Sequence, residues 1–499
     1  MKRIIVLALL FCTLASGAQV NQELRREFPV SDDFENFNVA LFGAKGMMIF
    51  GGDKVSRLGK TSWKFLKTDQ NLESLDSLNI ELPGQLGLNY FEVDGDNLVL
   101  LFVSFKSRTY RLSILDFNTM KFNNFNGNLP RKLYLWEYGI GGNTLFLRYY
   151  QKKAFGLMTI NLKTGASKQV PIKVTAGKKP WCENMVVDKE SGEAFVYMNY
   201  YLKAKKTGTQ AFVFDETGKR IETFTLAGMN DHNLTSITST KMGPDHYVFM
   251  GTYSKTSSVT AEGFFISELI EGDRKFIKYY NFMNLENFTD YLPKKRQDKI
   301  AKKKEKSAAR GKDLSYNFYM VSHPLLSVED RYYFLGEFFY PTYRTETYQT
   351  YVNGRWVTQT RVVFDGYQYT HAVMASFDKE GEMVWDNCFE MWLDYKPMTR
   401  RMFVTATINL EGRIDLLFSS RKDIINKTFS LEGEKLREIS RSGIDTGRED
   451  DKIKRSLSMM NYWYDGHFIA YGMQLIKDKG KSDGKKRRNV FFVNKISPE

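Results

Sequence analysis

The fold of this chain is decided by a phrase at residues 210–226, QAFVFDETGKRIETFTL. An apolar strand ends at Asp215, a tight turn contains Gly218, and a second strand follows. Glycine tolerates the positive φ of such turns, and the aspartate side chain can bond the turn backbone. The phrase recurs at 157–170, 375–381 and 426–439. Regular recurrence of one strand–turn–strand unit is typical of a repeat architecture.

The repeats extend over almost the whole chain. Most units are about 40–50 residues long, the length of a four-stranded propeller blade. The sequence therefore predicts an all-β fold, a β-propeller of seven or eight four-stranded blades in one domain over 19–499. Residues 27–30 are a weak candidate for completing the last blade. The units lie at about 38–82, 87–128, 133–172, 182–226, 234–282, 318–392, 402–440 and 456–496.

In this rhythm the chain resembles exported bacterial β-propeller proteins with WD40- or YVTN-like repeats, a group of uncharacterised function. The resemblance rests on the turn phrases and covers nearly all of 19–499. The Trp-Asp dipeptide of WD repeats occurs once, at Trp385-Asp386, and does not recur from unit to unit. The resemblance therefore implies a fold and no particular chemistry.

The first eighteen residues have the pattern of a secretory signal peptide. Lys2 and Arg3 precede an apolar run over 4–14, and small residues follow at 15–18. This pattern predicts cleavage before Gln19 and export to the periplasm or the cell surface. No later stretch has the roughly 18 consecutive apolar residues of a membrane helix.

The net charge of +14 is concentrated in two basic runs. Lys294–Lys312 carries +8 and Lys477–Arg488 carries +5, so the rest of the mature chain is nearly neutral. The first run, inside an insertion at 286–315, is predicted to be a helix capped by Asp290 and ended by Gly311. Pro293 suits its first turn.

This predicted helix lacks an apolar stripe, which favours a solvated insertion. The alternative is peripheral contact between Lys294–Lys312 and an anionic surface, either lipid, polysaccharide or an acidic protein. Nucleic acid is not expected as a partner, because neither basic run contains aromatic residues for base stacking.

A second insertion, at 338–371, contains Asn353-Gly354, the strongest hairpin signal in the chain. A type I′ turn there would pair Tyr351 with Trp356, Thr347 with Thr360 and Glu346 with Arg361. Alternating polar and aromatic residues predict a ribbon that extends beyond the propeller. The candidate binding residues are Tyr343, Tyr348, Tyr351, Trp356 and Tyr367, because rigid aromatic side chains provide contact area at low entropic cost. Alternatively, the ribbon folds back and covers the propeller.

Groups for catalysis or metal binding are sparse. The chain contains no P-loop and no dinucleotide fingerprint. Asp94–Asn97 and Ile444–Gly447 are explained as turns, so no catalytic residue, metal or cofactor is expected. Cys182 and Cys388 are expected to be free buried thiols, with a single disulfide as the alternative. The histidines are scattered at 232, 246, 323, 371 and 467.

The sequence thus favours an exported, non-enzymatic propeller that binds an envelope protein or a glycan. The alternative is a polysaccharide hydrolase or lyase with its site at the propeller axis. Converging Asp, Glu and His on the innermost strands would favour the enzyme. Ser, Thr and small apolar residues there would favour the binding protein.

Overall fold

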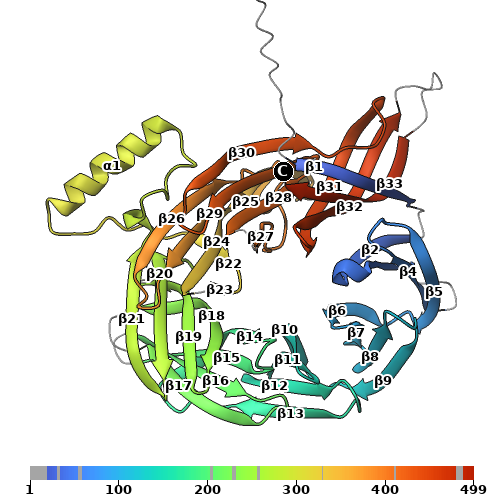
Figure 1. Ribbon diagram of the computed structural model, residues 1–499, viewed down its shortest axis with the longest axis horizontal. Coiled ribbons are helices and arrows are strands. Elements are labelled where there is room, and N and C mark those ends of the chain that lie inside the picture. Colours follow the sequence, from blue (N-terminus) through green and yellow to red (C-terminus); the bar gives the residue numbers. More distant parts are fainter. Residues whose placement is uncertain are drawn as a thin grey trace, which may run out of the picture.

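The computed structural model describes residues 20–30, 34–53, 59–202, 206–227, 232–255, 259–328, 330–409, 412–478 and 487–498. They form eight antiparallel sheets arranged in a ring (Figure 1). Seven sheets have four strands, and the sixth blade along the chain has an additional short strand, β23. The fold is a β-propeller with eight blades, which confirms the prediction and decides between seven and eight.

The first four blades are β2 (Phe34–Leu41), β3 (Met47–Asp53), β4 (Lys60–Thr68) and β5 (Ser74–Pro83); β6 (Gly87–Asp94), β7 (Asn97–Ser104), β8 (Thr109–Asp116) and β9 (Phe122–Asn128); β10 (Leu133–Gly141), β11 (Thr144–Gln151), β12 (Ala154–Asn161) and β13 (Ser167–Ile172); and β14 (Lys178–Val187), β15 (Ala194–Tyr201), β16 (Thr207–Phe214) and β17 (Arg220–Ala227). The next two are β18 (Asn233–Gly243), β19 (His246–Ser254), β20 (Gly263–Ile270) and β21 (Asp273–Asn281); and β22 (Tyr319–Ser322), β23 (Leu326–Val328), β24 (Arg331–Val352), β25 (Arg355–Phe377) and β26 (Met383–Glu390). The last two are β27 (Thr405–Ile408), β28 (Arg413–Ser420), β29 (Asp423–Ser430) and β30 (Lys435–Gly443); and β31 (Asp451–Tyr464), β32 (His467–Asp478), β33 (Arg487–Pro498) and β1 (Val20–Pro29). The described helices are η1 (Gly43–Lys45), η3 (Phe282–Asn284) and α1 (Lys294–Ala308).

The middle strands of the blades are mostly buried and rich in apolar residues, because both faces of each sheet are covered by neighbouring blades. In β7, Leu98 packs toward the first blade, whereas Val99 packs toward the third. Among the described residues the core consists of eight hydrophobic clusters, one between each pair of adjacent blades. The ring is therefore held together by side-chain packing between sheets, since each apolar face of a sheet is buried against the facing sheet of the next blade.

The ring is closed by its N-terminal strand. β1 pairs with β33 and becomes the outermost strand of the last blade. The amide of Val30 continues this pairing by donating to the Asn489 carbonyl at 3.1 Å. The weak prediction that 27–30 completes the last blade is confirmed, although the strand begins earlier, at Val20.

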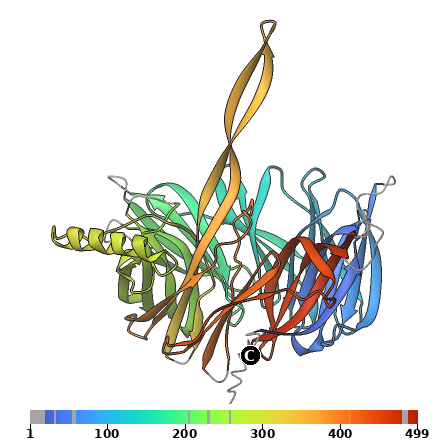
Figure 2. The ribbon, with the colours of Figure 1, turned by 90° about the horizontal axis from the view of Figure 1, so that it is seen from above.

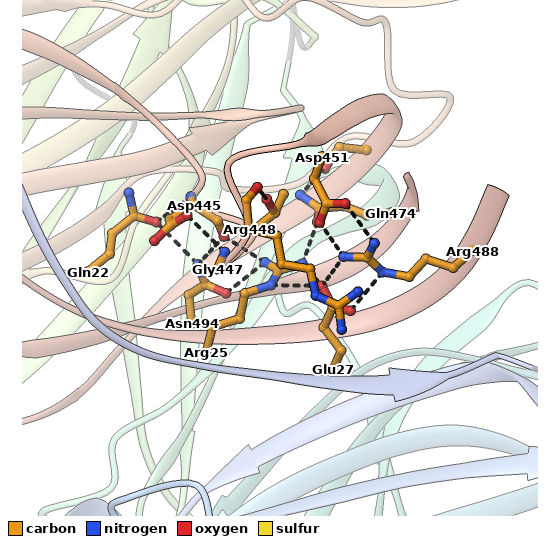
Figure 3. Close-up of polar contacts among 12 residues, drawn as sticks. Gln22, Arg25, Glu27, Asp445, Gly447, Arg448, Asp451, Gln474, Arg488 and Asn494 are labelled. Atoms are coloured by element: carbon orange, nitrogen blue, oxygen red, sulfur yellow. Dashed lines mark hydrogen bonds and ion pairs between the residues drawn. The ribbon is translucent and has the colours of Figure 1, made fainter. Parts of the chain in front are cut away.

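A polar network fixes this closing strand (Figure 3). Arg488 donates from Nε to Glu27 at 3.0 Å and from Nη1 to Asp451 at 2.8 Å. Arg25 donates from Nη2 to the same Glu27 at 2.7 Å. Because the Asp451 side chain is only 1% exposed, these charge-assisted hydrogen bonds hold β1, β31 and β33 together in a partly dehydrated setting.

All blades expose equivalent ends on the same side of the ring. Within a blade the innermost strand comes first, and each following strand runs in the opposite direction. One face of the ring therefore holds the start of the innermost strand, the turn between the second and third strands, and the link to the next blade. The β24–β25 connection is such a turn, and it rises from this face (Figure 2). We call this side the hairpin face.

The helix α1 lies in the link between the fifth and sixth blades and projects from the edge of the ring (Figure 1). No residue of α1 is buried, as the sequence predicted, and Ile300 is only partly covered by the neighbouring core. The predicted cap at Asp290 is wrong: the N-cap is Pro293. A proline disfavours helical backbone in the residue before it, so the helix cannot extend back to Asp290. The chain leaves the helix through Gly311, at φ +66°.

Candidate functional site

The hairpin is a two-stranded ribbon that stands away from the ring (Figure 2). Its turn has positive φ at both Asn353 and Gly354, +51° and +79°, as a type I′ turn requires. Tyr351 pairs with Trp356, Thr347 with Thr360, and Glu346 with Arg361, as predicted from the sequence. Beyond Phe339 on β24 and Tyr367 on β25, the described strands pair only with each other, so both outer backbone edges of the ribbon are open there. At the base, the Tyr367 amide donates to the Pro397 carbonyl at 2.9 Å.

The two sides of the ribbon differ in chemistry because side chains alternate along each strand. One side carries Tyr343 and Phe364 near the base and Tyr351 and Trp356 near the turn, with no charged residue between them. Tyr343, Tyr351 and Trp356 are 63%, 61% and 68% exposed. This side is therefore uncharged and carries exposed aromatic rings at both ends, separated mainly by threonine residues.

The other side of the ribbon carries the charges. Glu346 accepts hydrogen bonds from Arg361 at 2.9 Å and Arg344 at 2.8 Å, and these bonds lower the pKa of Glu346. Tyr348 donates its hydroxyl proton to Gln359 at 2.9 Å and lies 5.6 Å from the Arg361 guanidinium. The Tyr348 side chain is therefore held in place on this side by Gln359 and Arg361.

The candidate residue Tyr367 lies elsewhere, at the base of the ribbon. It is partly buried, and its ring contacts Phe339 and Phe364 at centroid distances of 5.1 and 4.9 Å. The structure therefore separates the five predicted residues into four on the projecting ribbon and one that packs beneath it.

A second group of residues, which the sequence analysis missed, lies on the hairpin face where β10 and β14 begin. Each of these inner strands has a β-bulge, at Trp136 and at Glu183, where the register shifts by one residue. Bulges redirect side chains and are frequent beside functional sites. Trp136 is 64% exposed and Tyr134 is 59% exposed. A hollow of about 450 Å³ lies beside Trp136 and is lined by Glu137, Arg148, Tyr150, Phe155, Cys182, Glu183 and Arg400.

The polar groups of this hollow are held in place by hydrogen bonds. Glu137 Oε2 accepts from Arg148 Nε at 2.7 Å and from the Met185 amide of the next blade at 2.6 Å. Glu183 accepts from Asn199 Nδ2 at 3.2 Å and from the Ser236 amide at 3.3 Å. Burial raises the pKa of both Glu137 and Glu183. Both glutamates thus link adjacent blades and also line the hollow.

The histidines are embedded in separate local contacts. His371 is fully buried between Tyr291 and Phe338, with ring centroids 3.7 and 4.6 Å away. Burial lowers its pKa well below the usual value, so it is neutral. The other four have different neighbours: His232 stacks on Tyr279, and His246, His323 and His467 contact Glu268, Glu337 and Glu23, respectively.

No group of three His, Cys, Asp or Glu side chains suited to a metal ion occurs among the described residues. Cys182 and Cys388 are both free, and they lie in different blades, on β14 and β26. Cys388 is buried as expected, whereas Cys182 is partly accessible. Burial raises the pKa of each thiol to about 12, so neither is a ready nucleophile.

Two expectations fall partly or wholly outside the described residues. The signal peptide at 1–18 is one, and most of the second basic run, at 479–486, is the other. In the part of the chain that is described, no helix has the length and apolar character needed to cross a membrane.

Comparison with known proteins adds fold similarity only. No protein-family model and no curated protein matches the chain. Among solved structures it is similar to the Dos1 propeller, with 11% identity, 96% of each chain covered and a TM-score of 0.41. It is also similar to the propeller domain of the Trilobed protease from Pyrococcus furiosus, with 11% identity, 80% and 99% coverage and a TM-score of 0.35. It is similar to the tricorn protease as well, with 13% identity and a TM-score of 0.36; the match covers 85% of this chain and 36% of the tricorn protease chain. What these structures share with this chain is the β-propeller fold.

Proposed function

We propose that this protein is an exported, non-enzymatic β-propeller that binds a partner protein in the periplasm or at the cell surface. The ribbon is its main contact surface. The observation that carries the proposal is that the ribbon projects from the ring (Figure 2) and that Tyr343, Tyr351 and Trp356 are exposed on its uncharged side. Exposed aromatic residues of this kind dominate the energetics of protein interfaces.

The open backbone edges of the ribbon favour a protein partner. Unpaired amide and carbonyl groups along a strand can bond a strand of another chain. Arg344 and Arg361 are engaged by Glu346 and so do not block such pairing with free charges. The ribbon therefore offers a partner both hydrogen bonds and aromatic contacts.

The position of the closing strand β1, directly after the predicted cleavage point, supports export. The predicted cleavage point before Gln19 immediately precedes β1, which begins at Val20. Removal of the leader would leave the whole closing strand in the mature protein. Export is tested by N-terminal sequencing of the protein recovered from the cell envelope: an uncleaved terminus would contradict it.

The helix α1 provides a second, peripheral contact in this proposal. Its basic side chains are exposed, and it projects from the edge of the ring (Figure 1). Contact with an anionic surface should weaken as salt is added, because screening acts strongly on exposed charges. Sedimentation with vesicles containing anionic lipid, at low and high salt, tests this contact.

The ribbon is tested by replacing Tyr348, Tyr351 and Trp356 together with serine. Because these side chains are exposed, the melting temperature should stay near that of the wild type. Capture of partners from envelope extract should fall sharply, since each central aromatic anchor commonly contributes about 2 kcal/mol.

The matched control replaces Thr347, Thr358 and Thr360 with serine on the same ribbon, which keeps the aromatic rings. This control should capture the same partners as the wild type. Undiminished capture by the aromatic variant would refute the proposed role of the ribbon. A collapse of its melting temperature would show that the rings belong to the core.

The alternative function, a polysaccharide hydrolase or lyase, is supported by Glu137 and Glu183, two carboxyl groups on innermost strands that line the same hollow. Glu137 has a raised pKa beside a hollow on the hairpin face, as a general acid requires. Incubation with polysaccharides, followed by measurement of new reducing ends and of unsaturated products, tests this alternative. Turnover that is abolished in Glu137→Gln would replace the binding proposal with the enzymatic one.

A further inference from the structure

The hairpin face contains a groove that is separate from the ribbon. A hollow of about 610 Å³ is lined by Phe105 and Arg108 from the β7–β8 turn and by residues 129, 130 and 132–136. The hollow beside Glu137 and Arg148 has Trp136 in its lining as well. The two hollows therefore share the Trp136 side chain: the first borders the second blade through Phe105, and the other borders the fourth blade through Glu183. We call the two hollows together the Trp136 groove.

The first half of the groove is an aromatic platform. Phe105, Tyr134 and Trp136 are 53%, 59% and 64% exposed. The bulge at Trp136 removes this residue from the regular pairing of β10 with β11. The indole also lies 5.8 Å from the Arg148 guanidinium, which restrains it. Three exposed rings on one concave surface are costly in water and mark a contact site.

The second half of the groove presents fixed polar groups. Arg148 is 7% exposed, and its Nε is held by Glu137 at 2.7 Å. Glu183 lines the same hollow from β14, and Arg400 reaches it from the link between the sixth and seventh blades. Two carboxyl groups and two guanidinium groups give nearly balanced charge, with acceptors and donors side by side. Such a setting suits a ligand rich in hydroxyl groups better than a strongly charged ion.

We propose that the Trp136 groove binds an oligosaccharide. A pyranose ring has an apolar face of C–H bonds, which packs on an aromatic ring, and hydroxyl groups at its edge, which donate to carboxylates and accept from guanidinium groups. The groove supplies both kinds of partner, already positioned, and preorganised groups lose little entropy on binding. Because Trp136 lines both hollows, the groove offers places for more than one sugar unit and suits a chain of sugars.

The test uses an array of neutral and acidic oligosaccharides of bacterial, plant and animal origin, followed by calorimetric titration with the best binder. Trp136→Ala should weaken binding about tenfold or more, the loss expected when a central aromatic anchor is removed. Arg400→Ala should weaken it several-fold. Both residues are exposed, so the melting temperatures should not change.

Trp356→Ala is the matched control, because Trp356 is 68% exposed on the ribbon and outside the groove. It should bind the oligosaccharide like the wild type. The inference is overturned if no oligosaccharide on the array binds, or if Trp136→Ala binds as tightly as the wild type. Loss of binding in Trp356→Ala alone would place the sugar on the ribbon instead. Failure of the ribbon proposal would leave these results unchanged, since that proposal concerns protein capture.

Discussion

Ring closure can be tested at a single buried carboxylate, Asp451. Its two oxygens accept from the guanidinium of Arg488, which also binds Glu27 on the closing strand (Figure 3). Asp451→Ala leaves Arg488 and Arg25 sharing Glu27 as their carboxylate partner in this network. We expect β1 to be held less firmly against β33.

The expected cost is about 2 kcal/mol. Removing one partner of a fully buried ion pair costs about 3–5 kcal/mol. Arg488 is 25% exposed and keeps Glu27, so solvent and the remaining partner reduce this penalty. Hydrogen bonding to Arg488 holds the pKa of Asp451 below its usual value. The stabilisation is therefore present at neutral pH and lost as the pH falls through this lowered pKa.

The assay is urea unfolding at pH 7, combined with hydrogen exchange at the β1 amides. Asp423→Ala is the control: it removes a carboxylate that pairs with Arg441 at 3.1 Å, but Arg441 is 53% exposed. That pair should contribute less than about 1 kcal/mol. The reasoning is refuted if Asp451→Ala loses no more stability than Asp423→Ala, or if exchange in β1 is unchanged.

Three further predictions concern the rest of the fold. Replacing α1 with a short Gly/Ser linker should change the free energy of unfolding by less than about 0.5 kcal/mol, because no residue of α1 is buried. A large drop in melting temperature would contradict this expectation. Because Cys182 and Cys388 are free thiols, adding reductant should leave the melting temperature unchanged, and both should react in a thiol titration of the denatured mature protein. A disulfide between them, found by mass spectrometry of the unreduced protein, would contradict this prediction. His371 is neutral in the folded protein and becomes protonated on unfolding below about pH 6.5, so the free energy of unfolding should fall as the pH drops below that value. In urea titrations between pH 7 and 5, His371→Phe should lose stability less steeply than the wild type. Parallel curves would disprove the assignment.

The sequence predicted those features that depend on neighbours along the chain. Asp215 and Gly218 mark a turn between two strands, and the same pattern recurs in the blade at 133–172, whose bounds are those that the structure shows. Asn353-Gly354 determined the register of the ribbon from the turn to the Tyr343–Phe364 pair, since a type I′ turn leaves one way to pair the flanking strands. Both predictions rest on local backbone geometry.

The groove and the closure depend instead on contacts between distant blades. Nothing in the pattern around Trp136 or Glu183 shows that two bulges lie side by side, because adjacent blades meet only when the ring forms. Arg400 joins them from a link more than two hundred residues away along the chain. The blade number was likewise undecided until β1 was seen to pair with β33. Turn chemistry thus determines each blade locally, whereas the packing of eight apolar sheets into a closed ring decides which polar and aromatic residues share a surface.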